Sequence, residues 1–146
     1  MREDMGLYRG KLKDTGEWVE GYLTYRYRYD QQSRKEILGP VIDCPQEVTL
    51  GNTTGKVICS YQVVPGTEGQ FTGLTDKNGK KIFEGDVVKA ERICNGKAWQ
   101  GSVVWWNGCF AIQGIKDRNF PPIDLFVEYE VIGNIHDNPE LLEVSK

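Results

Sequence analysis

Two aspartates, Asp76 and Asp86, are the carboxylates whose positions first suggest acid–base chemistry. A catalytic pair needs a defined separation and a raised pKa on one member, and nothing in their spacing supplies either. Both lie in short glycine turns, Asp76 to Gly79 and Glu84-Gly85-Asp86. Aspartates in such turns accept hydrogen bonds from nearby backbone N–H groups. We therefore expect Asp76 to hold its turn and Asp86 to fix the start of the strand that follows.

The thiols and the single imidazole are the other groups that could ligate a metal or attack a substrate. No two of the cysteines form a Cys-x-x-Cys pair, and His136 is the one histidine; the cysteines are Cys44, Cys59, Cys94 and Cys109. Zinc sites usually take their ligands in close local pairs. A nucleophilic triad needs a Ser or Cys in a recognisable setting beside its base. We expect reduced, buried cysteines that pack as small hydrophobic residues, no metal, no cofactor and no enzymatic activity.

Adjacent tryptophans, Trp105 and Trp106, are the strongest candidates for a contact surface. They precede Asn107-Gly108, the best hairpin signal in the chain. Adjacent strand residues face opposite sides, so one indole can fill the core while the other is exposed or half-covered. The exposed ring would mark a protein interface, or an outer lobe or partner subunit would cover it.

A second candidate surface is the alternating strand that ends in Thr24-Tyr25-Arg26-Tyr27-Arg28-Tyr29. Period-two alternation places the tyrosines on one face and the arginines on the other. One interpretation is a nucleic-acid-binding face, in which cations lie beside stacking aromatics; it would use Arg9, Arg26, Arg28, Tyr25 and Tyr27. The other is a half-buried strand with its tyrosines inward and its arginines in solvent, which we favour because few cations are present.

The elements that carry these residues are predicted to be mainly β-strands. A hairpin is expected over residues 6–29, a loop over 30–36, and further short strands up to Val64, with breaks at Gly39-Pro40 and at Cys44-Pro45. After Pro65-Gly66 the pattern is that of small, strongly bent sheets in a partly open, SH3-like barrel. Asn138-Pro139-Glu140 predicts one short C-terminal helix. We expect an N-terminal β lobe (1–64) and a C-terminal barrel lobe (65–146), or one continuous domain.

Composition bounds the protein to one small domain or two lobes. The chain has 146 residues with 17 glycines, and 18 basic against 21 acidic residues give a net charge of −3. A near-balanced charge argues against general attraction to nucleic acid or an anionic membrane. No secretory leader or apolar membrane span is evident, so we expect a cytoplasmic protein.

Residues 70–88 carry a family resemblance. Its strings are Gln70-Phe71-Thr72-Gly73-Leu74, Asp76-Lys77-Asn78-Gly79-Lys80 and Ile82-Phe83-Glu84-Gly85-Asp86-Val87-Val88, with Trp18 to Leu23, Glu130 to Ile135 and Asn138 to Leu142 agreeing. In these strings the chain resembles the YopX family of small phage- and prophage-encoded proteins. The resemblance implies a mostly-β phage-related protein in the host cytoplasm, and it brings no catalytic residues. We therefore expect a non-enzymatic module that binds another protein or its own copies, with nucleic-acid binding as the alternative.

Overall fold

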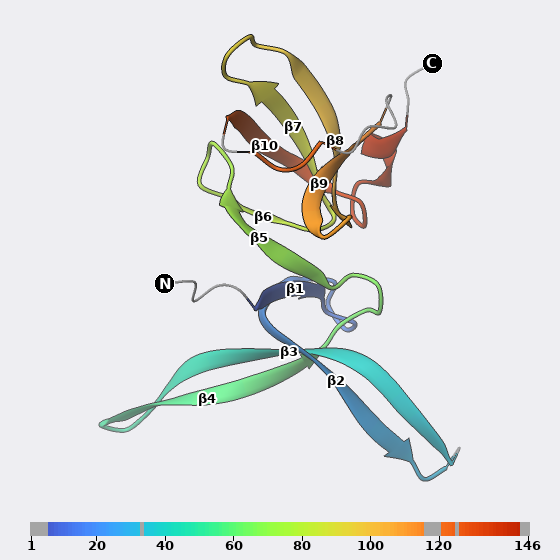
Figure 1. Cartoon of the computed structure of the whole chain (residues 1–146). Helices are drawn as coiled ribbons and strands as arrows, with labels where there is room; N and C mark the ends of the chain where they lie inside the picture. The colour runs from blue at the N-terminus through green and yellow to red at the C-terminus, as the bar shows by residue number, and fades with distance from the viewer. Residues whose placement is uncertain (1–5, 33, 116–120, 125, 144–146) are drawn as a thin grey trace. The chain divides into compact units, whose positions relative to one another are not determined.

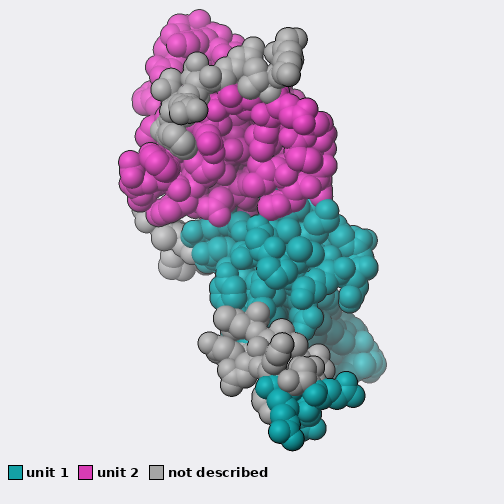
Figure 2. Space-filling model, turned by 90° about the vertical axis from the view of Figure 1, so that its right-hand side faces the viewer, with its two compact units in different colours: residues 1–70 teal, residues 71–146 magenta. Residues whose placement is uncertain are grey.

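Ten β-strands and one short 3-10 helix make up the described part of this chain in a computed structural model, and the strands form two antiparallel sheets (Figure 1). The structure describes residues 6–32, 34–115, 121–124 and 126–143, with the backbone alone for 27–30 and 35–38. The chain divides into two compact units, residues 1–70 and 71–146 (Figure 2). The sequence prediction had placed this division after Val64. The prediction of mainly β structure is confirmed.

Unit 1 is built from the first strands of the chain. These are β1 (Leu7–Lys11), β2 (Trp18–Asp30), β3 (Lys35–Leu50) and β4 (Thr53–Gln62), and strand β5 (Gly69–Thr75) begins in this unit. They are hydrogen-bonded in the order β4-β3-β2-β1-β5, with Gly69 and Gln70 of β5 pairing with β1. The predicted hairpin over residues 6–29 is confirmed as β1 and β2, which pair from Leu7–Tyr22 to Lys11–Trp18.

Strand β3 takes part in two different ribbons. Its first half pairs with β2, from Asp43–Tyr22 to Lys35–Asp30, and its second half pairs with β4, from Val41–Gln62 to Leu50–Thr53. Only residues 41–43 therefore have partners on both sides, and beyond them the two ribbons diverge (Figure 1). Val41 and Ile42 are buried at this shared segment, whereas residues 45–58, the β3–β4 arm, are all exposed.

The predicted breaks at Gly39-Pro40 and Cys44-Pro45 are wrong, because β3 runs unbroken through both prolines. Proline is tolerated in a strand where its missing N–H has no ladder partner. Pro45 lies beyond the last residue that pairs with β2, and Pro40 lies just outside the β3–β4 ladder, where Val63 N donates to its carbonyl oxygen at 3.3 Å. Pro45 therefore removes no ladder bond, and Pro40 forgoes only the bond that its own N–H could have donated to Val63 at the end of the ladder.

At Gly21 the backbone of β2 lies unusually close to the backbone of β3. A Cβ on Gly21 would overlap the backbone oxygen of Asp43, and it would come within 2.9 Å of Ile42 Cγ2. The absence of a side chain lets β2 lie directly against β3 at this point. Ile42 is fully buried as a result, and Val63, which lies against Gly10, is buried in the same unit.

Unit 2 contains the remaining strands. They are the rest of β5, then β6 (Lys81–Phe83), β7 (Asp86–Arg92), β8 (Ala98–Trp106), β9 (Cys109–Gly114) and β10 (Val127–Asn134). Strands β5 and β6 pair at Phe71–Phe83 and Thr75–Lys81, and the other four form a sheet in the order β10-β7-β8-β9. Its core contains Ile82, Val88, Ala90, Val103, Ile112 and Tyr129.

The turns of unit 2 follow the glycine signals. Gly79, Gly85 and Gly108 all have positive φ, at 81°, 93° and 81°. Asn107 also has a positive φ of 49°, so the β8–β9 hairpin turns through two left-handed residues, as an Asn-Gly pair favours. The predicted hairpin between Trp106 and Cys109 is confirmed.

The four-stranded sheet of unit 2 is open, with β9 and β10 at its edges in the residues described, and these strands form no closed barrel. The ladder between β7 and β10 is irregular between Val131 and Gly133, where the sheet changes register. The C-terminal element is a single 3-10 turn over Pro139–Leu142 with Pro139 in its first turn.

Candidate functional site

Asp76 and Asp86 both accept hydrogen bonds from backbone N–H groups. Asp76 Oδ1 accepts hydrogen bonds from the N–H groups of Asn78 and Lys80, both at 2.9 Å, and its Oδ2 accepts one from Val131 N at 3.0 Å. Burial alone would raise the pKa of Asp76, but these three backbone donors together bring that pKa below its usual value. Its predicted role in holding the turn is confirmed.

Asp86 is almost completely buried, and its Oδ2 accepts a hydrogen bond from Phe83 N at 2.8 Å. The bond spans the Glu84-Gly85 reversal and fixes the first residue of β7, as the sequence predicted. Both carboxylates thus close turns of their own unit. Among the residues described, no group of three or more His, Cys, Asp or Glu side chains is placed to hold a metal ion.

The cysteines were expected to be buried, and that expectation is wrong. Cys94 and Cys109 are exposed, and Cys44 and Cys59 are half-buried, although all four are free thiols. The reason is their positions: Cys94 lies in the β7–β8 turn, Cys109 ends a hairpin turn, and the other two lie where the β3–β4 arm leaves the sheet. Short-range sequence patterns do not reveal these exposures.

The two tryptophans lie at the end of β8, where the hairpin extends past the core of unit 2. Trp105 is 54% exposed and Trp106 is 47% exposed, so neither fills the core, contrary to the expectation for one of them. Val103, two residues earlier on the Trp105 side of the strand, is buried. The Trp105 ring meets the ring of Phe110 edge-on, with 4.8 Å between centroids. The hairpin end therefore carries exposed aromatic surface on both faces, with Trp105 and Phe110 on one face and Trp106 on the other.

The arginines and tyrosines of the alternative nucleic-acid face are not gathered into one basic surface. Arg9 is buried, with its guanidinium 4.7 Å from the centre of the Trp18 ring. Arg26 is exposed, but it forms an ion pair with Asp43, both of whose carboxylate oxygens lie 3.1 Å from Nη2. The side chains of Tyr27 and Arg28 lie outside the described residues.

Tyr25 is 53% exposed, so the tyrosine face is not turned inward at this position. Its hydroxyl donates a hydrogen bond to Glu68 Oε1 at 3.3 Å. Partial desolvation raises the pKa of Tyr25, and the neighbouring Glu68 carboxylate raises it further. A carboxylate beside Tyr25 and another beside Arg26 oppose the approach of a phosphate backbone.

A further apolar surface was missed at the sequence level. Val48, Leu50 and Val57 of the β3–β4 arm are 36%, 78% and 45% exposed. The register Gln46–Val57, Val48–Gly55 and Leu50–Thr53 places the three on one face of the ribbon, since directly opposed residues point the same way. The alternation was visible in the sequence, but only the structure shows that the described elements of unit 1 leave this face uncovered.

Comparison with known proteins identifies a family and a similar solved structure. The chain matches the family profile described as YopX protein over residues 7–143. It is also similar to the crystal structure of protein EF1440 from Enterococcus faecalis, with 28% sequence identity, coverage of 93% of this chain and 96% of that chain, and a TM-score of 0.49. No curated protein matches the chain. In the part of the chain that the structure describes, no helix is both long enough and apolar enough to cross a membrane.

Proposed function

Because this chain belongs to the YopX family, and because it exposes two adjacent indoles, we propose that it is a non-enzymatic protein of phage or prophage origin that binds a protein. The partner is a second copy of the chain or another protein in the host cytoplasm. The single observation that carries this proposal is the exposure of both Trp105 and Trp106 at the free end of the β8–β9 hairpin.

Leaving an indole ring half exposed to water is unfavourable in free energy. An indole buries 150–250 Å² when fully covered, so covering the exposed half of one ring removes roughly 100 Å² of largely apolar surface. At about 25 cal/mol per Å², that corresponds to roughly 2.5 kcal/mol for one ring. Tryptophans are enriched among the residues that dominate binding energy. Two such rings on opposite faces of one strand suit a partner that grips the hairpin end from both sides.

The absence of enzymatic activity is proposed because the two aspartates most suited to acid–base chemistry bond to the backbone instead. Asp76 and Asp86 are engaged by backbone N–H groups of their own turns. A general base needs a proton to abstract from a bound substrate, and a carboxylate that closes a turn is poorly placed for that task.

The SH3-like description of unit 2 also stays a proposal. The meander β7-β8-β9, together with the change of register in β10, supports a strongly bent sheet of that kind. The open order β10-β7-β8-β9 fits a barrel that is only partly closed.

The test is the concentration dependence of the sedimentation coefficient for the wild type, Trp105→Ala and Trp106→Ala. We expect the wild type to self-associate, or to retain a protein from host lysate that then co-purifies stoichiometrically, and each substitution to weaken the association while unfolding free energy changes little. Phe126→Ala is the matched control, because Phe126 is 76% exposed but lies away from the hairpin end in sequence.

Nucleic-acid binding remains the opposing outcome. A monodisperse monomer at high concentration, with steeply salt-dependent binding to single-stranded DNA or RNA, would contradict the proposal. Loss of that binding in an Arg26→Ala, Arg28→Ala double variant would assign it to the face of β2.

A further inference from the structure

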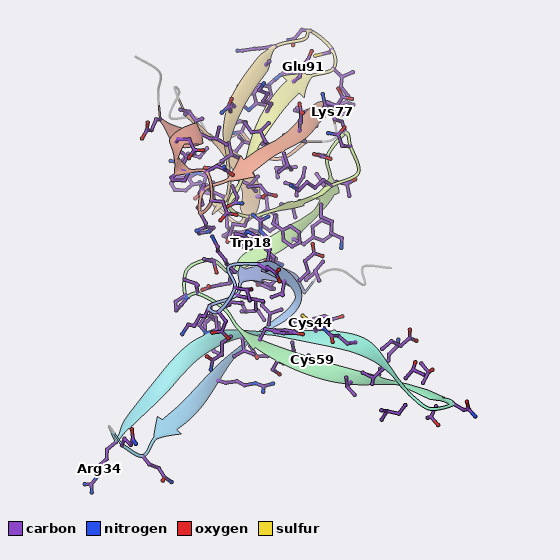
Figure 3. All side chains as sticks on the ribbon, turned by 180° about the vertical axis from the view of Figure 1, so that it is seen from behind. Trp18, Arg34, Cys44, Cys59, Lys77 and Glu91 are labelled. Atoms are coloured by element: carbon purple, nitrogen blue, oxygen red, sulfur yellow. The ribbon has the colours of Figure 1, made fainter. Side chains whose placement is uncertain are left out.

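Two thiols lie directly opposite one another at the base of the β3–β4 arm. Cys44 of β3 and Cys59 of β4 are register partners, and both are half-buried (Figure 3). Every residue between them, from 45 to 58, is exposed. The pair therefore marks the point at which the ribbon leaves the rest of unit 1.

The register fixes the distance between them. Val63 N donates to Pro40 O, so Pro40–Val63 occupies a hydrogen-bonding position of the β3–β4 ladder. These positions recur every second residue, which makes Cys44–Cys59 a hydrogen-bonded pair with Cα atoms about 5.5 Å apart. Disulfides are formed between Cα atoms about 4.4–6.8 Å apart. Directly opposed side chains also project from the same face, so the two sulfur atoms share one side of the ribbon.

We propose that Cys44 and Cys59 form a reversible disulfide that clamps the base of the β3–β4 arm, with a small-molecule disulfide such as oxidised glutathione as the oxidant.

The disulfide is expected to be reversible because Cys44 and Cys59 occupy a hydrogen-bonded position of the ladder. Cβ atoms of directly opposed residues lie about 4.5–5.5 Å apart and are closer at non-hydrogen-bonded positions, whereas a relaxed disulfide needs about 3.8 Å. The ribbon must close slightly to form the bond, and strained or exposed disulfides are the ones that thiols reduce readily. The arm can accommodate this movement because none of its residues is packed into a core.

The contacts of the reduced thiols set the order of the steps. Cys44 Sγ donates to Glu20 O at 3.0 Å, and Cys59 Sγ donates to Gln46 Oε1 at 3.4 Å. Burial raises the pKa of Cys44, and the nearby Cys59, Asp43 and Glu20 raise it further. A raised pKa lowers the fraction of Cys44 that is thiolate, so Cys44 is assigned the second attack, which takes place within the chain on a sulfur already held beside it.

The exchange requires only the two cysteines and one molecule of the small disulfide. The Cys59 thiolate attacks one sulfur of the small disulfide, forms a mixed disulfide and releases one small thiolate. The Cys44 thiolate then attacks the Cys59 sulfur, forms the Cys44–Cys59 bond and releases the second small thiolate. The two protein protons end on the two small thiols, so the protein loses two electrons and the small disulfide gains them.

The consequence for the arm is a change in order. A two-stranded ribbon without a covering layer is marginally stable in water. Joining its base removes open conformations of the arm, since the closed ring restricts the chain when the ribbon frays. Thiol redox state would thereby control how firmly the ribbon holds Val48, Leu50 and Val57 on one face.

The test is oxidation of the folded, full-length protein with oxidised glutathione, followed by thiol blocking and tryptic digestion. Trypsin separates the two cysteines, because Lys35, Lys56 and Lys77 bound peptides 36–56 and 57–77. We expect these two peptides to be joined, two of the four thiols to be lost, and the bond to be reversed by reduced glutathione. Amide exchange across residues 45–58 should slow on the order of tenfold after oxidation.

The matched control is the Cys94→Ser, Cys109→Ser double variant, which removes the two exposed thiols and should keep the joined peptides. Cys44→Ser and Cys59→Ser should each abolish them. If either serine variant fails to fold, the comparison of oxidised with reduced wild type decides alone. A stable glutathione adduct as the end product, a bond between two chains, a bond to Cys94 or Cys109, or unchanged amide exchange in the arm would each overturn the proposal.

Discussion

Replacing Asp76 by Asn tests how strongly one carboxylate holds unit 2 together. Asp76 is 7% exposed and accepts three backbone hydrogen bonds, two from its own turn and one from Val131 in β10. Asparagine keeps one oxygen, which can still accept from Asn78 and Lys80, but its amide group would direct N–H bonds at Val131 N–H. The substitution therefore removes the charge from two hydrogen bonds and leaves one backbone donor without an acceptor.

The magnitude follows from these losses. Hydrogen bonds to a charged group contribute about 1.5–3 kcal/mol and neutral ones about 0.5–1.5, so two weakened bonds cost about 2 kcal/mol. A buried donor left without an acceptor costs about 1–3 kcal/mol more. We expect Asp76→Asn to lower the free energy of unfolding by about 3–5 kcal/mol at pH 7, measured by urea unfolding with tryptophan fluorescence.

The pH dependence gives an independent check. The folded-state pKa of Asp76 lies below its ordinary value of 3.8, so the unfolded chain takes up a proton first as the pH falls. The stabilisation is complete above that ordinary value and is lost as the pH falls from it through the folded-state pKa. The difference in unfolding free energy between wild type and Asp76→Asn should therefore shrink below about pH 4.

The control is Glu130→Gln, which removes a carboxylate from β10 whose ion pair with Lys77 is exposed, at 3.4 Å. Such pairs contribute about 0–1 kcal/mol, so this variant should stay close to the wild type. A loss below about 1 kcal/mol for Asp76→Asn, or a difference that does not change with pH, would refute the assigned role of the carboxylate.

Four further substitutions test other parts of the fold by the same urea assay. Gly101→Ala should lower the free energy of unfolding by more than about 2 kcal/mol, because its Cβ would overlap a backbone oxygen of β9. Gly39→Ala is its control and should change that free energy by less than about 1 kcal/mol, because the space around Gly39 is open. Equal effects of the two substitutions would contradict this account of the packing. Gly108→Val should cost about 1–3 kcal/mol through its positive φ alone, since nothing lies within 4 Å of its Cβ position; no loss would mean that the turn adapts. Arg26→Ala should cost about 1–2 kcal/mol, because the side chain of Asp43 is only 16% exposed and loses its hydrogen bonds from Arg26; no measurable loss would show that the pair does not support the sheet.

Local chemistry predicted the turns and the aspartate roles well. Asn107-Gly108 and Asp76 to Gly79 specify their conformations through residues only two to four positions apart, so a single sequence contains the cause. The mainly β class followed from the same kind of signal. These features depend on short-range sterics and hydrogen bonding, which the rest of the chain does not override.

Features that depend on distant partners could not be predicted. The prolines of β3 were read as breaks because the side of the ladder that each one faces depends on where β2 and β4 end. Arg26 was read as an open cation, yet its partner Asp43 lies in the next strand. The sequence predicted that one of the two indoles fills the core, but both lie outside it. Pairing with β9 determines how far β8 extends past Val103, and the sequence of β8 alone does not show this.

Two apolar surfaces, one in each unit, share a property that distinguishes them from incidental surface hydrophobicity. Trp105 and Trp106 lie at the end of the β8–β9 hairpin, and Val48, Leu50 and Val57 lie along the β3–β4 arm. Single exposed hydrophobic residues are normal on a protein surface. Hydrophobic residues grouped on a hairpin instead expose a contiguous apolar patch to water, and such patches often mark contact sites. We propose that the tryptophan group contacts another protein, which the Trp105→Ala and Trp106→Ala variants test, and that the order of the arm that carries the second group follows the redox state of Cys44 and Cys59.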